Sequence, residues 1–295
     1  MKYVIGKPYE GKDLKNYLTK ELNLSSRLIT ALKKYDGGIL LNGKSVFVNV
    51  ILHENDILEL DFKDREEDEN EFLVKTPMEL DIIYEDENLT VVNKSANMPT
   101  HQSLNHYTDT LANGLAYRYK DRPYVFRAIN RLDRNTSGVV VTANNRFYAD
   151  VLASKLKNGA FHKEYIAVVK GRVDSDGVID APIRRVPNSI MVREVAPDGE
   201  YARTEYVSLM ACDEISVLRV RPITGRTHQI RVHMSYIGHP IIGDDLYYEE
   251  CEIIGRQALH AYRLKIDGVG EYTAPVPEDM DMLIRRYFRD YEISE

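Results

Sequence analysis

The first forty residues carry apolar positions at helical spacing. Apolar residues recur every three or four positions over 14–22, and a second stripe of this kind runs through Leu28, Ile29 and Leu32. Both stripes predict helices, and Ser25 or Ser26 is the expected N-cap of the second one. Gly37-Gly38 should then end the helical pattern, because glycine is a poor helix former that favours the position after a helix.

β-prone runs follow the two helices. Asn42-Gly43 separates the runs 39–41 and 45–48, and this dipeptide suits the positive φ angles of a tight hairpin turn. Residues 57–62, Ile-Leu-Glu-Leu-Asp-Phe, predict a further strand. We therefore expect residues 1–62 to form a small α/β module with two helices and a short sheet.

A run of charged residues, 63–73, comes next and has no apolar periodicity. Such a run is typical of a solvated linker, and an acidic interaction tail is the alternative. We place a domain boundary here. An acidic linker over 63–79 is expected to join the N-terminal module to a second domain over 80–295.

The second domain is rich in short β-prone runs bounded by turn signals. Strands are expected over 80–84, 89–92, 138–142, 165–169, 217–220 and 229–233, and helices around 107–119, 146–157 and 277–291. Because strands and helices do not alternate strictly, a doubly wound parallel sheet is disfavoured. The pattern predicts an α+β fold whose second domain has a mixed, mostly antiparallel β-sheet, flanking helices and a central cleft.

Charge and composition narrow the picture only slightly. The net charge of −7, from 39 basic and 46 acidic residues, argues mildly against a nucleic-acid partner. The segment from Arg118 to Arg134 nevertheless holds six basic residues and two acidic ones, and a local patch of this kind can hold a phosphate chain. Cys212 and Cys251 are the only cysteines, which indicates a reducing compartment and a cytoplasmic protein. No apolar run approaches the ~18 residues of a membrane span.

Motifs for metals and nucleotide cofactors are missing from the sequence. His228 and His233 lie five residues apart on or beside the predicted strand 229–233, so their side chains should point to opposite faces. No carboxylate occurs near them at ligand spacing, and the chain has no glycine-rich phosphate-binding loop. We therefore expect neither a metal nor a cofactor.

Three segments carry candidate chemistry. Asp133 lies shortly before Thr136-Ser137-Gly138, where an aspartate is ordinarily a turn former and alternatively a catalytic carboxylate. Tyr165 opens a predicted strand, either as a core tyrosine or as part of a site. The third segment, 222–234, forms either a surface ion-pair network or a set of donors for phosphate or carboxylate, with Arg226, His228 and Arg231 as the donors.

Together these segments resemble the RluA-type pseudouridine synthases, which isomerise uridine in structural RNA. The resemblance covers roughly residues 80–280, and the N-terminal module resembles the S4-type RNA-binding domain often joined to this enzyme. The chain departs from the family pattern at Asn130, where histidine is usual, and at Ser95 and Asn97, where proline and glycine are usual. The shared motifs, in chain order, are Arg131-Leu132-Asp133 with Thr136-Ser137-Gly138, Lys163-Glu164-Tyr165-Ile166-Ala167, Thr224 through His233, Gly243-Asp244-Asp245-Leu246-Tyr247, and Leu259-His260-Ala261.

The resemblance implies a reaction and a role for each candidate residue. Uracil must leave its N1 linkage to ribose, rotate and rejoin through C5, after the nucleotide has flipped into a pocket. Asp133 would attack a carbon directly or help to expel the base, and both routes stay open. Tyr165 would lie against the base, as a base or as a pocket wall, and Arg231 would hold Asp133 ionised. The remaining candidates would bind substrate, with Arg131 filling the space left by the flipped base and Arg226 and His228 meeting phosphate or sugar.

The expected function is therefore pseudouridine formation in RNA without a cofactor. Large-subunit ribosomal RNA is the first expected target, and transfer RNA is the second. Two other functions stay open, namely a non-catalytic RNA-binding regulator and a glycosidase-like hydrolase that pairs Asp133 with Asp244 or Asp245. We expect a monomer that binds RNA and neither a membrane nor a metal.

Overall fold

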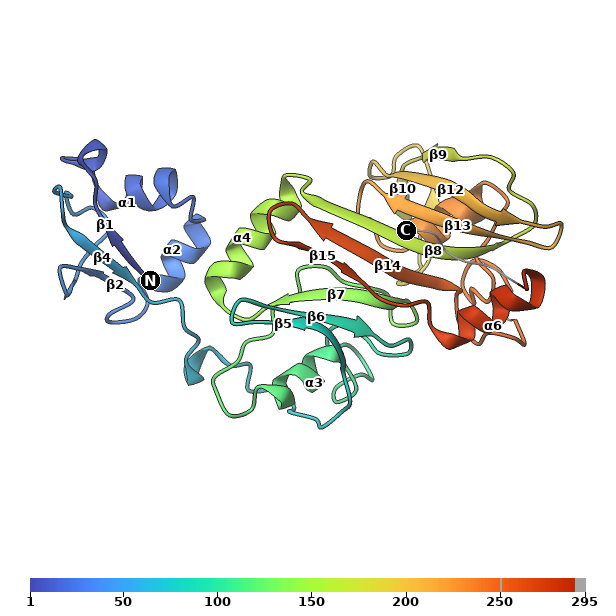
Figure 1. Cartoon of the computed structure of the whole chain (residues 1–295), viewed down its shortest axis with the longest axis horizontal. Helices are drawn as coiled ribbons and strands as arrows, with labels where there is room; N and C mark the ends of the chain where they lie inside the picture. The colour runs from blue at the N-terminus through green and yellow to red at the C-terminus, as the bar shows by residue number, and fades with distance from the viewer. Residues whose placement is uncertain (250, 290–295) are drawn as a thin grey trace.

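The computed structural model describes residues 1–249 and 251–289 and has two unequal parts (Figure 1). The N-terminal module is drawn in blue at one end, and its strands form an antiparallel sheet of order β1-β4-β2-β3. Its elements are β1 (Lys2–Val4), the 3-10 turn η1 (Lys7–Tyr9), α1 (Leu14–Asn16), the π-helical turn η2 (Tyr17–Glu21), α2 (Ser26–Leu32), β2 (Ile39–Leu41), β3 (Lys44–Ser45) and β4 (Ile57–Leu60).

Local sequence signals account for this module. Both expected helices are present, the first as α1 running into η2. The Ser25 hydroxyl accepts the Leu28 N–H at 3.1 Å and so caps α2 as predicted. Asn42 and Gly43 have φ angles of 52° and 77°, the left-handed conformation that the hairpin turn requires.

The acidic linker is not simply solvated, which corrects the sequence-based expectation for 63–73. It contains the 3-10 turn η3 (Glu66–Asp68). The Asp64 side chain is only 4% exposed and accepts two hydrogen bonds from Arg127, at 2.6 and 2.8 Å. Arg146 contacts Asp64 at 3.5 Å and also binds Asp68. A charge run does not reveal partners far along the chain, so the sequence could not show these ion pairs.

The module also packs directly on the second domain, through helix α4 (Arg146–Lys157). The rings of Phe62 and Phe147 lie 4.8 Å apart between centroids. The backbone N–H of Ser25 donates to the Asp150 carboxylate at 2.8 Å. These contacts and the linker ion pairs hold the two parts together.

The second domain is built on one nine-stranded sheet. Its order is β5-β6-β7-β14-β8-β13-β12-β9, with β15 paired to β14, and only the β7–β14 pair is parallel. The predicted mixed, mostly antiparallel sheet is therefore confirmed. β10 and β11 form a separate two-stranded sheet. The elements of the second domain are β5 (Asp81–Glu85), β6 (Leu89–Lys94), α3 (Leu111–Arg118), β7 (Ser137–Ala143), α4, β8 (Phe161–Lys170), β9 (Gly177–Asp180), β10 (Ile183–Arg185), β11 (Arg193–Val195), β12 (Arg203–Ala211), β13 (Ile215–Pro222), α5 (Gln229–Tyr236), β14 (Leu259–Ile266), β15 (Gly270–Thr273) and α6 (Glu278–Tyr287).

Helices cover both faces of the sheet (Figure 1). Strand β7 is buried along its whole length, so adjacent residues face different cores. Val141 packs in a cluster with Leu152 of α4, and Val140 packs with Leu115 of α3. Helices α5 and α6 contribute to the core over β8 and β13. The expected helix 277–291 is observed as α6, which ends at Tyr287, and positions 290 and 291 lie outside the described residues. Within the described residues, no helix is long and apolar enough to cross a membrane.

The predicted strand over 229–233 is wrong, because these residues form helix α5. Residues 229–234 are all buried, so their apolar residues mark no single exposed or buried face from which a period could be read. The helix changes the site. On a strand, His228 and Arg231 would face opposite sides, whereas three residues apart on a helix they share a face.

We predict that Arg146→Gln lowers the free energy of unfolding by about 1–3 kcal/mol, the cost of leaving buried polar groups unpaired. Arg146 is 9% exposed and contacts Asp64 and Asp68, whereas Gln cannot neutralise either carboxylate. The measurement is urea denaturation of the whole chain. Arg285→Gln, in an exposed ion pair with Asp281, is the control and should leave the midpoint unchanged. Equal midpoints for Arg146→Gln and the native chain would contradict the prediction.

Candidate active site

A cleft of about 890 Å³ opens where the loop before β7, the start of β8 and the segment before α5 meet. Such a concave pocket with converging polar groups is the usual form of a ligand site. The structure brings all six predicted site residues to its lining: Arg131, Asp133, Tyr165, Arg226, His228 and Arg231.

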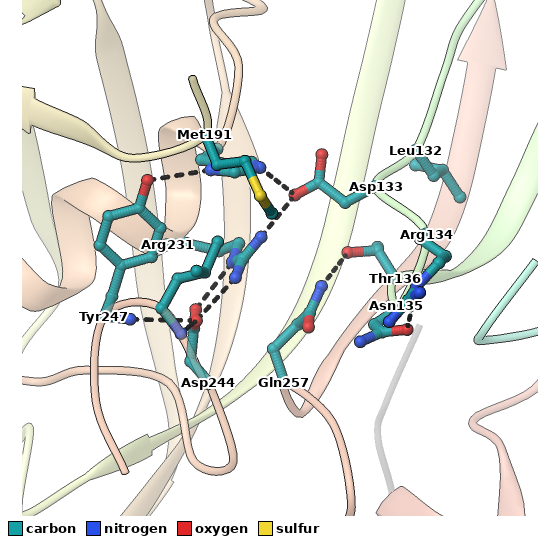
Figure 2. A network of polar contacts seen from close by, with 12 residues as sticks. Leu132, Asp133, Arg134, Asn135, Thr136, Met191, Arg231, Asp244, Tyr247 and Gln257 are labelled. Carbon is teal, nitrogen blue, oxygen red and sulfur yellow. Dashed lines mark hydrogen bonds and ion pairs between the residues drawn. The ribbon is translucent and has the colours of Figure 1, made fainter. Parts of the chain in front are cut away.

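Asp133 lies in the turn that leads into β7. The turn is closed by backbone, since the Thr136 N–H donates to the Asp133 carbonyl at 3.1 Å. The carboxylate is not used for this turn. Its Oδ2 faces Arg231 Nη1 at 3.2 Å and His228 Nε2 at 3.7 Å (Figure 2). Within residues 1–249 and 251–289, Oδ1 accepts no hydrogen bond, so one oxygen is held and the other is available to a ligand.

Arg231 is fixed from the opposite side by Asp244. The guanidinium is 4% exposed and makes a bidentate pair with the fully buried Asp244 carboxylate, at 2.8 and 2.7 Å. Asp244 also accepts the backbone N–H groups of Leu246 and Tyr247. The hydrogen bonds and negative charges of Asp244 and Asp133 raise the pKa of Arg231 against the opposing effect of its burial. The guanidinium therefore presents Nη1 to Asp133 in one orientation.

His228 sits at the start of α5 in a left-handed backbone conformation, with φ 57°. The Tyr247 hydroxyl accepts the Arg193 N–H at 2.9 Å and lies 2.9 Å from His228 Nδ1. His228 therefore contacts Tyr247 through Nδ1 and faces Asp133 through Nε2. Burial lowers the pKa of His228, so the ring is neutral near pH 7.

Lys94 holds the Asp133 loop in place through hydrogen bonds to backbone carbonyls. Its side chain is 1% exposed, and its Nζ donates to the carbonyls of Ser95 at 2.8 Å, Met98 at 2.7 Å and Arg134 at 3.1 Å. Burial lowers the pKa of Lys94 to about 7. The amine ties residues 95–98 to the backbone next to Asp133, so it positions the loop and does not touch the cleft.

Arg256 and Gln257 support the same loop from the other side. Arg256 makes a bidentate pair with Asp279, at 2.6 and 2.8 Å, and donates to the Asn135 carbonyl at 3.2 Å. Gln257 Nε2 donates to the Thr136 hydroxyl at 3.2 Å (Figure 2). The turn after Asp133 is therefore held through both its backbone and its side chains.

The end of the turn is a close approach of two strands. Gly138 has φ 114°, and a Cβ there would lie 2.2 Å from the Ala261 carbonyl oxygen, so only glycine fits. The adjacent Ser137 hydroxyl lies 2.9 Å from His260 Nδ1, and His260 Nε2 lies 3.1 Å from the Ala274 carbonyl. Because that carbonyl can only accept, Nε2 carries the proton and Nδ1 accepts from Ser137.

Two of the three departures from the family pattern, Asn97 and Asn130, have structural explanations. Asn97 adopts φ 60°, a conformation that asparagine tolerates better than most residues. Asn130 binds β7, because its Nδ2 donates to the Val139 carbonyl at 3.0 Å and its Oδ1 accepts the Val141 N–H at 2.8 Å. Asn130 therefore orients the segment that carries Asp133.

Tyr165 is half-buried in the cleft wall and packs against both neighbouring cores. Burial and the negative charge of Asp133 raise its pKa, so the phenol keeps its proton at neutral pH. At the rim, Arg226 Nη1 lies 2.5 Å from Glu200 Oε2 and its Nε donates to the Tyr201 carbonyl. Arg131 is exposed and has no hydrogen-bond or ion-pair partner in the described part of the chain.

Several residues of this site had no role predicted from the sequence. Tyr247 and His260 lie in shared motifs, so the motifs themselves were the available signal. Lys94, Arg256 and Gln257 gave no signal of their function, because each binds backbone or side chains of distant segments. In the described ranges, no group of three or more histidine, cysteine, aspartate or glutamate residues could hold a metal ion.

We predict that His260 makes the fold sensitive to acid. Burial lowers its pKa from 6.5 to about 4, so between these values the unfolded chain binds a proton that the folded chain does not. Stability contributed by neutral His260 is present above pH 6.5 and is lost as the pH falls towards 4, by about 3 kcal/mol in total. Urea midpoints between pH 7 and 4 measure this loss. His260→Gln should flatten the profile, whereas the partly exposed His239→Gln should not, and parallel profiles for all three proteins would refute the assignment.

Comparisons with known proteins agree with this geometry. A family model for RNA pseudouridylate synthase matches residues 88–236. The chain is 41% identical to an uncharacterised RNA pseudouridine synthase of Bacillus subtilis, over 90% of this chain and 96% of the relative. It is 34% identical to the ribosomal large subunit pseudouridine synthase D of Pseudomonas aeruginosa, over 90% and 88% of the two chains. The human RNA pseudouridylate synthase domain containing 1 superposes with a TM-score of 0.57 at 27% identity, covering 70% of this chain and 94% of that one. The chain belongs to the RNA pseudouridylate synthase family.

Proposed function

We propose that this enzyme converts specific uridines of large-subunit ribosomal RNA to pseudouridine, with Asp133 as the catalytic carboxylate. The observation that carries the catalytic assignment is the divided role of the Asp133 oxygens. Oδ2 is held by buried Arg231, and Oδ1 is free of protein donors in the described ranges. A carboxylate held through one oxygen by a guanidinium, with its other oxygen available, suits attack on a sugar carbon or expulsion of the base from it.

The choice of ribosomal RNA is supported by the relatives. The Pseudomonas aeruginosa enzyme, by its name, acts on the large ribosomal subunit, and a relative of the same name in Borreliella burgdorferi is 32% identical over 92% of this chain. Transfer RNA is the alternative target. Mapping pseudouridine in both RNA classes, from cells with and without the gene, distinguishes the two.

The proposed reaction breaks the N1–C1′ bond of uridine and forms a C5–C1′ bond; C5 loses its proton and N1 gains one, so the product is an isomer of the substrate. The protein must reach the base outside the RNA stack, and the cleft has room for a nucleotide. Arg231 places a buried positive charge 3.2 Å from the Asp133 carboxylate, and this charge-assisted contact orients it. We assign Tyr165 the role of pocket wall, because its raised pKa disfavours the phenolate that a base would require.

We further propose that Arg131 contacts the RNA. It is exposed at the cleft beside Asp133, and a guanidinium plane stacks well on bases, including those that a flipped nucleotide leaves behind. The hydrolase alternative has no support, since Asp244 is fully buried on Arg231 and Asp245 does not line the cleft. The two unpaired cysteines fit the cytoplasm as the proposed compartment.

The N-terminal module is proposed to be an S4-like RNA-binding domain that selects the target. Its sequence holds no catalytic motif, and α1, η2 and α2 lie beside a set of exposed basic side chains. These are Lys15, Lys20, Arg27, Lys33 and Lys34. The packing of this module on α4 gives an RNA bound there a defined position relative to the cleft.

We expect Asp133→Asn to reduce isomerisation by on the order of 10³-fold or more, the scale set by loss of a transition-state charge. Asn keeps the shape and favours turns as Asp does, so folding should persist. Single-turnover tritium release from RNA labelled at uridine C5 measures the step, together with a thermal melt and an RNA titration. Asp213→Asn removes an equivalent charge from an exposed aspartate and should leave the rate unchanged. Near-native tritium release by folded Asp133→Asn would falsify the assignment.

The RNA role of the N-terminal module has its own test. Changing Lys33 and Lys34 to Gln in the whole chain should weaken RNA binding and flatten its salt dependence, by about 0.7–0.9 in log–log slope for each phosphate that is no longer neutralised. A filter-binding series at increasing salt measures both quantities. Lys265→Gln, an exposed change in β14, is the matched control. An unchanged slope in the double variant would remove the module from the RNA interface.

A further inference from the structure

The hairpin β10–β11 has two faces that differ in charge pairing. In its antiparallel register Arg184 lies opposite Glu194, and Arg185 lies opposite Arg193. Residues directly opposite each other project from the same face of a β-ladder. One face therefore carries an Arg–Glu pair, and the other carries two arginines side by side.

The first face is neutralised and the second is not. Arg184 donates to Glu194 at 2.9 Å and to Asp198 at 2.9 and 2.8 Å. Among residues 1–249 and 251–289, the Arg193 guanidinium donates only to the carbonyls of Met191 and Val192, and the Arg185 side chain has no hydrogen-bond or ion-pair partner. Like charges directly opposite destabilise a ladder, so an anion between the two guanidiniums would relieve a repulsion.

The hairpin is continuous with the active site. A groove of about 400 Å³ lies between it and residues 225–227, and these residues also line the active-site cleft. The backbone N–H of Arg193 donates to Tyr247, which in turn contacts His228. The charge of Arg193 is close enough to contribute to lowering the pKa of His228. A chain-like ligand whose reacting unit occupies the cleft can therefore extend along the groove.

We propose that Arg185 and Arg193 form a phosphate-binding pair for the RNA backbone next to the target uridine, an inference that rests on the proposed function. Guanidinium forks match phosphate oxygens in geometry and charge. The hairpin tip adds exposed apolar surface, with Ile190 83% and Met191 54% exposed. A ligand with both phosphates and flat bases fits this combination better than a simple anion does.

The test uses the full chain and large-subunit ribosomal RNA transcribed in vitro, with bulk transfer RNA as a second probe. Arg185→Gln/Arg193→Gln should weaken binding several-fold near physiological salt. The slope of log Kd against log salt should fall by about 0.7–0.9 for each phosphate that the variant no longer binds. Arg185→Gln alone should give about half of this change. The Arg185 side chain makes no hydrogen bond or ion pair within the described protein. This single variant should therefore fold, and it keeps the test valid if the double variant folds poorly.

Arg172→Gln is the matched control. Arg172 is exposed, pairs with Asp213 and follows the far end of β8 from the residues that line the cleft. It should leave Kd and slope unchanged. A native slope in both Arg185 variants, or an equal decrease in Arg172→Gln, overturns the proposal. Native enzyme that binds RNA without isomerising it contradicts the proposed function instead, and the slope comparison still decides the role of the hairpin.

Discussion

One buried guanidinium, that of Arg231, holds the active site together. Removing a guanidinium from water is costly unless its donors are satisfied, and Asp244 satisfies two of them from a fully buried position. The remaining nitrogen of the guanidinium, Nη1, then points towards Asp133. The loop before β7, which is distant in sequence, meets helix α5 and the loop that follows it on this cation. The cleft therefore presents a half-buried carboxylate beside a positive charge that is already held in place.

The loop that carries Asp133 is positioned chiefly through its backbone. Lys94 and Arg256 donate to its carbonyls, and Asn130 binds the strand that follows. A loop inside a domain has backbone groups that need partners, and here buried polar side chains from distant elements supply them. The same bonds restrict the loop to one conformation, which a reaction at a carboxylate oxygen requires. The residues that hold the loop are thus different from the residue that carries the catalytic oxygen.

Local patterning was enough to predict most of the fold. The Asn42-Gly43 hairpin, the Ser25 cap and strands such as β6 and β7 depend on neighbouring residues, which the sequence shows directly. Helix α5 was missed because burial on all sides removes the contrast between apolar and polar positions. For the site, motif resemblance found the six residues that line the cleft. It could not find the function of Lys94, whose partners are carbonyl oxygens of other segments and leave no trace in residue types.

Pairing, rather than net charge, determines where an acidic protein can accept RNA. In the basic segment 118–134, Arg118 is paired with Glu85 and Arg127 with Asp64, so these two cations add little to the field outside. Arg131 lies in the same segment without a carboxylate partner in the described structure, directly beside Asp133. Paired charges cancel at short range, whereas an unpaired cation in a cleft acts over roughly a Debye length, about 8 Å at physiological salt. Arg131 therefore places an unpaired positive charge at the cleft, although the chain as a whole is negative.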